Sequence, residues 1–483
     1  MKKLNDILSG YPYNLVQGSD QVTVQTIEFD SRKIKKGSLF IAIRGTETDG
    51  HQFINQAINS GATAIICEQV PDKVSDSSTI IKVENTREAL AWMAAAWFDH
   101  PSNTMKVIGI TGTNGKTTTA TMLYNVFREL GYPCGLFSTV KILINEQKKA
   151  ATHTTPDPMV IQQAMADMRD AGCEYCFMEV SSHATDQDRV KYIDFSAGVF
   201  TNITQDHLDY HKTFKNYIEA KQKFFNHLSF EAVAIYNIDD KNGAIMVQNT
   251  KAKRVSYSLK RPSDFKARLI KKEMDGMQLQ INDLQMWTML TGKFNAYNLM
   301  AVYATAAQFY EDKQELLTII SKQKPVRGRF EHLMSGKGVH GIIDYAHTPD
   351  AVENVLSTVD EVRTGNEQLI VIIGAGGNRD KTKRPLMAQK ACQYADTVVF
   401  TSDNPRFEEP GTIIQDMKSG IPVGFTGREF TIESREEAIK VAIGFARPGD
   451  IIVVAGKGHE TYQEVRGVRH HFDDREILLK HFK

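Results

Sequence analysis

The sequence predicts an α/β protein of more than one domain, built around mostly parallel sheets. Short apolar runs recur through most of the chain, and each is followed by turn residues and a helical pattern. Strands that are buried on both faces have this composition, and their alternation with helices is typical of parallel sheets. A length of 483 residues is too great for one ordinary core and favours roughly two to four domains.

Apolar runs of this kind give the candidate strands and the domain limits. The clearest are Val107–Ile110, Phe177–Val180, His340–Asp344, Leu369–Ile373, Thr397–Thr401 and Asp450–Ala455. In Ala267–Leu290 apolar and polar residues instead alternate around Asp275-Gly276, which predicts an antiparallel hairpin. Units begin near Asp99–Pro101 and near Pro325–Glu331, so we expect domains over residues 1–99, 100–329 and 330–483.

Composition and charge argue against several classes of protein. The 58 Lys and Arg residues balance the 58 Asp and Glu residues, so nucleic acid is not an expected partner. No apolar run approaches the roughly 20 residues that span a bilayer, and no apolar stretch of a signal peptide follows the first lysines. We expect a cytoplasmic protein with no membrane partner. The five cysteines, Cys173 and Cys176 among them, are expected to be buried, reduced thiols.

The most informative stretch follows the strand Val107–Ile110. It reads Thr111-Gly112-Thr113-Asn114-Gly115-Lys116-Thr117-Thr118 and leads into a helical pattern. Glycines let backbone N–H groups close around a phosphate, and the helix N-terminus adds its partial positive charge. Lys116 is placed to reach the β- and γ-phosphates, and the Thr117 hydroxyl to bind Mg²⁺. Ile110 stands where the longer standard loop has a glycine, but the whole pattern predicts a nucleoside triphosphate site.

Polar side chains also follow the strand Phe177–Val180. Glu179 stands at its end, and a carboxylate at a strand end near a phosphate loop is a plausible Mg²⁺ ligand. Ser181 and Ser182 come next, and either of them is a candidate helix cap.

Ionisable residues are concentrated again between Thr201 and Lys221. His207 and His211 are four residues apart, but no glutamate completes a zinc-binding His-Glu-x-x-His motif, so zinc is disfavoured. Lys221 lies in a helical pattern and, from its neighbours in the sequence alone, is expected to be solvated.

Three polar segments follow apolar runs in the last third of the chain. Gly374–Arg379 resembles a dinucleotide fingerprint, but Arg379 replaces its third glycine and makes a second nucleotide cofactor improbable. The basic run Arg379–Arg384 either binds an acidic ligand or is a solvated surface. Asp403–Arg406 ends a strand in a turn, where the Arg406 fork can pair with a carboxylate.

Together these segments resemble the Mur ligase family over nearly the whole chain. The matching segments are Asp30–Arg32, Gly37–Phe40, Asp49–His51, Gly112–Thr118, Thr154–Pro158, Met178–His183, Thr201–His211, Lys221, Phe294–Asn298, Gly328–Glu331, Asp344–Asp350, Gly376–Pro385, Asp403–Arg406 and Ala455–Glu460. The resemblance implies an N-terminal α/β domain for the uridine part of a substrate and a central P-loop ATPase with a mostly parallel sheet. It also implies a Rossmann-like C-terminal domain that binds an amino acid.

The resemblance also implies roles for individual residues. ATP is assigned the loop from Thr111 to Thr118 together with Asn298, Arg329, Asp344 and His347. The uridine-linked substrate is assigned Ser31, Thr154, Thr155, Ser181, Gln187 and Arg189. Catalysis is assigned to Lys116, Glu179, His207 and Lys221, and Mg²⁺ to Thr117, Glu179, His207 and Lys221. Lys221 matches the family's carbamylated lysine, N6-carboxylysine formed from CO₂, and this replaces the solvated role expected from its neighbours.

The reaction that the resemblance implies is ATP-dependent amide formation in peptidoglycan precursor synthesis. A substrate carboxylate attacks the γ-phosphorus of ATP, and an amine then displaces phosphate from the resulting acyl phosphate. In this family the sequence Asp-Asn-Pro-Arg marks enzymes that add meso-2,6-diaminopimelate to UDP-N-acetylmuramoyl-L-alanyl-D-glutamate. We therefore expect these two small molecules as substrates, and a monomeric enzyme.

The expected amino-acid pocket has a direct physical rationale. Its residues are Arg379, Asp403, Asn404, Pro405, Arg406, Gly456 and Glu460. Diaminopimelate differs from lysine by a second carboxylate, and a charge-assisted pair with Arg406 is worth ~1.5–3 kcal/mol. Glu460 suits the distal ammonium group.

Other functions stay open as alternatives. A divergent member of the family that uses another amino acid or peptide would fit the departures at Asn378 and Asp188, where the family pattern has other residues. A folylpolyglutamate synthetase-like ligase shares the core chemistry, but Asp30–Arg32 disfavours it. The intact Lys116 and Lys221 disfavour a catalytically silent binding protein.

Overall fold

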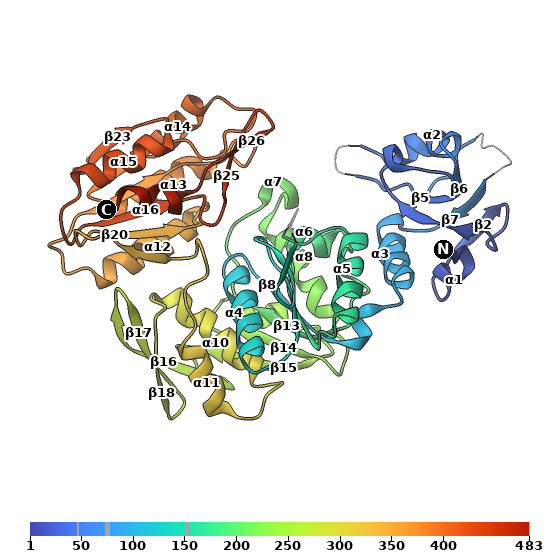
Figure 1. Ribbon diagram of the computed structural model, residues 1–483, viewed down its shortest axis with the longest axis horizontal. Helices are drawn as coiled ribbons and strands as arrows, with labels where there is room; N and C mark the ends of the chain where they lie inside the picture. Colours follow the sequence, from blue (N-terminus) through green and yellow to red (C-terminus); the bar gives the residue numbers. More distant parts are fainter. Residues whose placement is uncertain (46–47, 73–77, 150–153, 483) are drawn as a thin grey trace.

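The computed structural model describes residues 1–45, 48–72, 78–149 and 154–482, and it arranges them around three large sheets. Figure 1 shows the N-terminal sheet (blue) and the C-terminal sheet (orange to red) well apart, with the central sheet connecting them. The predicted α/β class with mostly parallel sheets is confirmed. Within the described part of the chain, none of the helices combines the length and apolar character needed to cross a membrane.

The N-terminal sheet has five strands in the order β2-β7-β6-β5-β4, parallel except for β2. Its strands are β2 (Asn14–Gln17), β4 (Thr26–Glu28), β5 (Ser38–Ile41), β6 (Ala62–Cys67) and β7 (Thr79–Lys82), and β1 (Lys2–Lys3) pairs with β3 (Thr23–Val24). The helices are α1 (Leu4–Leu8), α2 (Ile54–Asn59) and α3 (Thr86–Trp97), with short 3-10 turns over Ser31–Lys33, Gly50–Phe53 and Pro101–Thr104.

The central sheet has eleven strands in the order β11-β10-β9-β12-β8-β13-β14-β15-β16-β17-β18. The run from β9 to β16 is parallel, whereas both ends are antiparallel. The strands are β8 (Lys106–Thr111), β9 (Cys134–Phe137), β10 (Ile142–Ile144), β11 (Gln147–Lys149), β12 (Tyr175–Glu179), β13 (Phe195–Phe200), β14 (Val233–Asn237), β15 (Lys253–Ser258), β16 (Phe265–Glu273), β17 (Gly276–Ile281) and β18 (Leu284–Thr288). The predicted hairpin is present, because Glu273 pairs with Gly276 across its turn.

Helices cover both faces of the central sheet, which explains why β8 lacks a polar face. Its Ile108 and Ile110 belong to a core shared with Leu123 of α4, whereas Val107 belongs to the opposite core with Phe224 of α8. The helices of this region are α4 (Lys116–Glu129), α5 (Pro158–Asp170), α6 (Ser182–Asp186), α7 (Leu208–His211), α8 (Phe214–Asn226), α9 (Gly243–Met246), α10 (Lys293–Ala306) and α11 (Lys313–Ser321).

The C-terminal sheet has six strands in the order β19-β20-β24-β21-β22-β23, parallel except for β19. The strands are β19 (Glu331–Met334), β20 (His340–Asp344), β21 (Leu369–Ile373), β22 (Thr397–Phe400), β23 (Arg428–Thr431) and β24 (Ile451–Ala455), with a separate antiparallel pair β25 (Tyr462–Val465) and β26 (Val468–His471). The helices are α12 (Pro349–Val362), α13 (Lys383–Tyr394), α14 (Pro410–Lys418), α15 (Arg435–Phe445) and α16 (Asp474–His481).

Two further predictions concern the thiols and the domain limits. All five cysteines are buried and free, as the sequence predicts for reduced thiols. The limits after residues 99 and 329 stay predictions, although β19 of the C-terminal sheet begins at Glu331.

Candidate functional site

One cleft of about 930 Å³ lies between the central and C-terminal sheets. It is lined by residues that follow the carboxyl ends of parallel strands on both sides, where open α/β sheets bind ligands. The predicted site residues that line it are Thr113, Asn114, Gly115, Lys116, Thr117, Thr118, Thr154, Thr155, Glu179, Ser181, Arg189, His207, Asn298, Arg329, Asp344, His347, Arg379, Asp403, Asn404, Arg406, Gly456 and Glu460. Those outside its lining are Ser31, Thr111, Gly112, Gln187, Lys221 and Pro405.

The nucleotide loop connects β8 to α4, and its glycines are required where they stand. Gly115 has a φ of +87°, and a Cβ there would lie 2.4 Å from the Asn298 Oδ1 atom. A Cβ at Gly112 would lie 2.0 Å from the Thr201 hydroxyl oxygen. Any larger residue would therefore push the loop off its neighbours, whereas glycine leaves its backbone N–H groups free to surround a phosphate.

Lys116 begins α4 and has no carboxylate partner among the described residues. Its ammonium donates to the backbone oxygens of Gly112 and Thr113, both at 2.9 Å. Burial lowers the pKa of Lys116, and the more distant carboxylates of Glu179 and Asp206 oppose this. The ammonium thus rests against the loop that is predicted to surround phosphates.

Lys221 is buried beneath the same loop, so the expectation of a solvated helical lysine is wrong. Its side chain is on α8, and the residue is 1% exposed. The amine donates to the Gly112 oxygen at 2.9 Å and lies 4.9 Å from the centre of the Tyr217 ring. Burial, assisted by Lys116, lowers the pKa of Lys221 well below its usual value. The available signal was the spacing of Tyr217, Phe224 and Phe225, which places Lys221 on the buried face of α8.

Glu179 closes the adjoining side of the loop at the end of β12. It is fully buried, and its carboxylate accepts from the Thr117 hydroxyl at 3.0 Å and from the Thr139 backbone N–H at 2.8 Å. Ser181 caps α6 by accepting from the Ala184 N–H, as predicted. The Glu179 carboxylate is thus held beside the Thr117 hydroxyl, and both groups are predicted to bind Mg²⁺.

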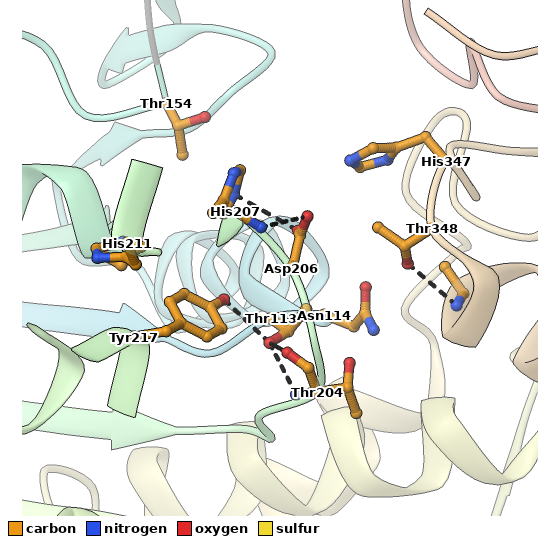
Figure 2. A network of polar contacts seen from close by, with 12 residues as sticks. Thr113, Asn114, Thr154, Thr204, Asp206, His207, His211, Tyr217, His347 and Thr348 are labelled. Atoms are coloured by element: carbon orange, nitrogen blue, oxygen red, sulfur yellow. Dashed lines mark hydrogen bonds and ion pairs between the residues drawn. The ribbon is translucent and has the colours of Figure 1, made fainter. Parts of the chain in front are cut away.

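His207 follows β13 and lies on the same side of the cleft. Figure 2 shows the Asp206 carboxylate between His207 and His347, which come from opposite walls. Burial lowers the pKa of His207 to about 3, although Asp206 opposes the shift. Burial likewise lowers the pKa of His347 to about 4. Both imidazoles are therefore neutral near pH 7 and have a free nitrogen lone pair for a metal or a hydrogen bond.

The predicted magnesium ligands supply donors that suit the ion. Among the described residues, no three His, Cys, Asp or Glu side chains are grouped so that they could hold a metal ion. A hydroxyl, a carboxylate and an imidazole are present at Thr117, Glu179 and His207, and a carbamate on Lys221 would add the second anionic oxygen donor. Hard oxygen donors of this kind suit Mg²⁺.

Arg329 links the two walls of the cleft. Its guanidinium donates to the Thr117 hydroxyl at 3.1 Å and lies 4.5 Å from the centre of the Tyr345 ring. Asp344, at the end of β20, accepts from the Phe330 N–H at 2.6 Å, and burial raises its pKa to about 6. With Asn298 beside Gly115, these side chains surround the outer end of the nucleotide loop.

The residues predicted to hold the uridine-linked substrate lie on the other side of the loop. The Arg189 guanidinium donates to the Thr155 oxygen at 2.9 Å and to the Gln187 side-chain oxygen at 2.6 Å. The Thr154 hydroxyl accepts from the Thr139 hydroxyl at 3.0 Å. Ser31 is in the N-terminal domain, in a 3-10 turn capped by Asp30, and does not reach the cleft.

Asp188 departs from the family pattern, and its structural role is now clear. Its carboxylate accepts from the Asn85 side chain at 3.3 Å, which connects it to the cap of α3 in the N-terminal domain. Burial raises the pKa of Asp188, so the carboxylate is more easily protonated than an exposed one.

The predicted amino-acid pocket is built on the turn after β22. Arg406 has a φ of +52°, and its guanidinium donates to the Gly377 oxygen at 2.8 Å, with no carboxylate partner among the described residues. Asn378 joins the two loops, because its side chain accepts from the Phe407 N–H at 3.0 Å and its own N–H donates to Glu408. Asparagine tolerates the left-handed φ of +51° found there.

Lys457 is fully buried behind two residues of the predicted pocket, Asn404 and Glu460, and the sequence did not reveal this position. Its buried ammonium donates to the Asn404 side-chain oxygen and to the Glu460 carboxylate, both at 3.0 Å. The Asn404 amide group donates to the same carboxylate at 2.8 Å. Burial and nearby Asp403 raise the pKa of Glu460, while Lys457 opposes the shift. The run Gly456-Lys457-Gly458 after an apolar strand was the only signal that pointed to Lys457.

Comparison with known proteins agrees with this arrangement. Residues 23–98 match the model described as Mur ligase family, catalytic domain; residues 110–306 match the Mur ligase middle domain; and residues 328–458 match the Mur ligase, glutamate ligase domain. The UDP-N-acetylmuramoyl-L-alanyl-D-glutamate--2,6-diaminopimelate ligase of Cytophaga hutchinsonii is 50% identical over 477 residues, 99% of this chain and 98% of the relative. The same-named protein of Parabacteroides distasonis is 48% identical over 99% of both chains.

Solved structures resemble the whole chain as well. A structure titled UDP-N-acetylmuramoyl-L-alanyl-D-glutamate--2,6-diaminopimelate ligase has a TM-score of 0.70 at 32% identity and covers 100% of this chain and 98% of its own. The MurF ligase from Thermotoga maritima in complex with ADP has a TM-score of 0.62 at 20% identity, covers 96% and 98%, and supports the fold alone. With three domain models and full-length relatives in agreement, this chain belongs to the Mur ligase family.

Proposed function

We propose that this chain is an ATP-dependent, ADP-forming ligase that adds meso-2,6-diaminopimelate to UDP-N-acetylmuramoyl-L-alanyl-D-glutamate in peptidoglycan precursor synthesis. One observation carries the proposal: the nucleotide loop and the Asp403–Arg406 turn line the same cleft. An enzyme that joins an activated carboxylate to an amine must bring both together, and the full-length relatives have this activity in their names.

The side of the cleft that contains the nucleotide loop, which we call the nucleotide wall, activates the substrate carboxylate. That carboxylate attacks the γ-phosphorus of ATP, the bond to the β,γ-bridging oxygen breaks, and an acyl phosphate and ADP result. Lys116 moves from the Gly112 and Thr113 oxygens to the phosphates, where it offsets their charge. Mg²⁺, held by Thr117, Glu179, His207 and modified Lys221, would supply further positive charge. Asn298, Arg329, Asp344 and His347 would surround the rest of ATP.

Burial prepares Lys221 for carbamylation. Only the neutral amine adds to CO₂, and because burial lowers the pKa of Lys221 well below its usual value, the neutral form is more populated there than in an exposed lysine. A nitrogen–carbon bond forms and one proton is released, so a neutral amine becomes an anion. The Gly112 oxygen that accepts from Lys221 is also an acceptor of Lys116, so the new negative charge would lie near the Lys116 ammonium and attract it.

The incoming amino acid would be held by groups of opposite charge. Arg406 and Arg379 line the cleft without a carboxylate partner among the described residues, and they would pair with the distal carboxylate of diaminopimelate. Glu460, fixed by Lys457 and Asn404, would accept from its distal ammonium. Asp403, Pro405 and Gly456 shape the turn around these groups. The amine of the near end then attacks the acyl phosphate, and phosphate leaves.

The remaining contacts and the setting follow from the same proposal. Thr154, Thr155, Ser181, Gln187 and Arg189 would hold the sugar and diphosphate, and Ser31 the uridine end. The substrates are small molecules, and nucleic acid and membranes are not partners. The enzyme would be a cytoplasmic monomer with domains over residues 1–99, 100–329 and 330–483.

The test is phosphate release from ATP by the pure protein with Mg²⁺, bicarbonate and UDP-N-acetylmuramoyl-L-alanyl-D-glutamate. Meso-diaminopimelate, L-lysine, L-ornithine and no amino acid are compared, and product masses are recorded. We expect release and a tripeptide mass with diaminopimelate only. Turnover with another amine would keep the ligase and reject the roles of Arg406 and Arg379. No turnover with any amine would reject this substrate and favour a divergent ligase.

A further inference from the structure

The basic run Arg379–Arg384 contains side chains in three different situations. Arg384 is fully buried and bonds to the carboxylates of Glu408 and Asp416 at 2.9 and 2.8 Å. Lys381 has a side chain that is 63% exposed and pairs with Glu408 at 3.2 Å. Lys383 differs from both, because it lines the cleft and has no hydrogen bond or ion pair with any described residue. The sequence left open whether this run binds an acidic ligand or is a solvated surface. The structure shows that the answer differs from one residue of the run to the next.

Lys383 begins α13, and its surroundings leave its charge without a near partner. The groups that act on it electrostatically are Asp206, Asp380 and Asp209, which favour the cation, and Arg379, which opposes it. Burial lowers the pKa of Lys383 against the pull of these carboxylates. Lys383 is half-buried and lines the cleft, and a partly desolvated cation without a bonded counter-ion favours an anion supplied from outside the chain.

Asp206 shows where that anion would lie. The same carboxylate acts electrostatically on Lys116, on Lys221 and on Lys383, yet it is within ion-pair distance of none of them among the described residues. Lys116 and Lys221 come from the central domain, whereas Lys383 comes from the C-terminal domain. His347, on the other side of Asp206 from His207 in Figure 2, is also within electrostatic reach of Lys383. Lys383, on α13, and Lys116, on α4, therefore line one cleft from the C-terminal and central domains and share Asp206 as an electrostatic neighbour.

We propose that the Lys383 ammonium contacts the phosphoryl group as it passes from ATP to the substrate carboxylate, as a catalytic residue supplied by the C-terminal domain. This rests on the proposed ligase function. In that step the carboxylate oxygen bonds to the γ-phosphorus while the bond to the β,γ-bridging oxygen breaks. No proton moves, and negative charge passes from the carboxylate to ADP. Lys383 offsets the charge on the phosphoryl oxygens from the side opposite Lys116.

The alternative ligand is the incoming amino acid, which also has a carboxylate and also lies near the C-terminal wall. The two possibilities differ in the step that they affect. A contact with the phosphoryl group changes formation of the acyl phosphate even when no amino acid is present. A contact with the amino acid changes only its binding and the second step.

The experiment compares Lys383→Gln and Lys383→Arg with wild type and with Lys381→Gln, an exposed lysine of the same run. Single-turnover ADP formation is measured with enzyme in excess over ATP, with UDP-N-acetylmuramoyl-L-alanyl-D-glutamate and without amino acid. We expect Lys383→Gln to slow this step about a hundredfold, the effect of removing one preorganised charge or donor. Lys383→Arg recovers part of the rate, and Lys381→Gln equals wild type. The KM for diaminopimelate stays near the wild-type value.

Thermal unfolding of the ligand-free variants separates catalysis from structure. Removal of a half-buried cation that has no counter-ion should leave the melting temperature of Lys383→Gln equal to or above that of wild type. An unchanged rate, a raised KM for diaminopimelate with a normal first step, or a slow step together with a lower melting temperature would each overturn the proposal. Absence of ADP formation by wild type would instead reject the ligase function itself.

Discussion

The two walls of the cleft treat positive charge in opposite ways. On the nucleotide wall, Lys116 and Lys221 donate only to backbone oxygens and a threonine hydroxyl, and neither has a carboxylate partner among the described residues. The C-terminal domain forms the other wall, which we call the amino-acid wall after its proposed ligand. Beneath it, Lys457 pairs with Glu460 at 3.0 Å, Arg435 with Asp474 at 2.7 Å, and Arg384 with Glu408 at 2.9 Å.

The difference separates cations that support the fold from cations that await a ligand. A buried ion pair is already neutral and fixes the loops above it. A buried or half-buried cation with only neutral acceptors stays available for phosphate or carboxylate groups. Arg406, on the amino-acid wall, belongs to the second kind, because its guanidinium donates only to the Gly377 oxygen. The distinction thus follows from each residue's partners and not from its domain.

The largest expected effect is at Lys221. Lys221→Ala removes the lysine whose proposed carbamate would complete the Mg²⁺ site, and we expect kcat to fall about a thousandfold, in the range found when a charged catalytic group is lost. Added formate should restore part of the activity, because it supplies a carboxylate in the vacated space. The measurement is steady-state phosphate release with and without formate.

A second lysine of α8 provides the control for that variant. Lys215 has a side chain that is 83% exposed, and Lys215→Ala should keep wild-type kcat. Full activity of Lys221→Ala would exclude a carbamate from the reaction. The carbamate would also be excluded if no short carboxylate restored the activity of Lys221→Ala and the wild-type rate did not depend on CO₂.

Much of the fold and the nucleotide loop could be predicted from the sequence. The apolar runs give β20 and β21 at their observed limits and β8, β12, β22 and β24 within a residue or two. The loop from Thr111 to Thr118 has a local pattern that determines its conformation, because strand, glycines and helix start follow one another. Features set by neighbours in the chain are therefore readable without a structure.

Features that depend on contacts between distant parts of the chain could not be predicted from the sequence. Lys221 and Lys215 are both lysines of one helix, and only the packing of α8 under the nucleotide loop makes one buried and the other exposed. Lys457 likewise depends on Asn404, which is 53 residues away in the sequence. Nothing in the basic run Arg379–Arg384 indicates which of its cations meets Glu408 and which faces the cleft. Pairing across loops is a tertiary property that spacing does not encode.

The next effect tests a paired cation. Lys457→Met leaves Glu460 and the Asn404 side-chain oxygen without their buried donor. Breaking one side of a buried pair costs about 3 kcal/mol or more, so we expect the C-terminal domain to melt several degrees lower. Calorimetry of the ligand-free protein measures this.

Lys440→Met, which breaks a partly exposed pair with Glu437, is the control and should shift the melting temperature little. Equal melting of Lys457→Met and wild type would mean that the pair does not support the fold.

The smallest effect is expected at Arg406, and it tests the contrast within a single wall. Because Arg406 has no carboxylate partner, Arg406→Ala should keep the wild-type melting temperature, unlike Lys457→Met. It should instead lower kcat/KM for diaminopimelate by about thirtyfold, which corresponds to the loss of ~2 kcal/mol from a charge-assisted pair. The KM for ATP should not change. Arg466→Ala is the matched control, since that side chain is 77% exposed and pairs with Glu409 on the surface. A variant that melts early with unchanged kcat/KM would place Arg406 among the structural cations, and the rule that unpaired cations mark ligand positions would then fail on this wall.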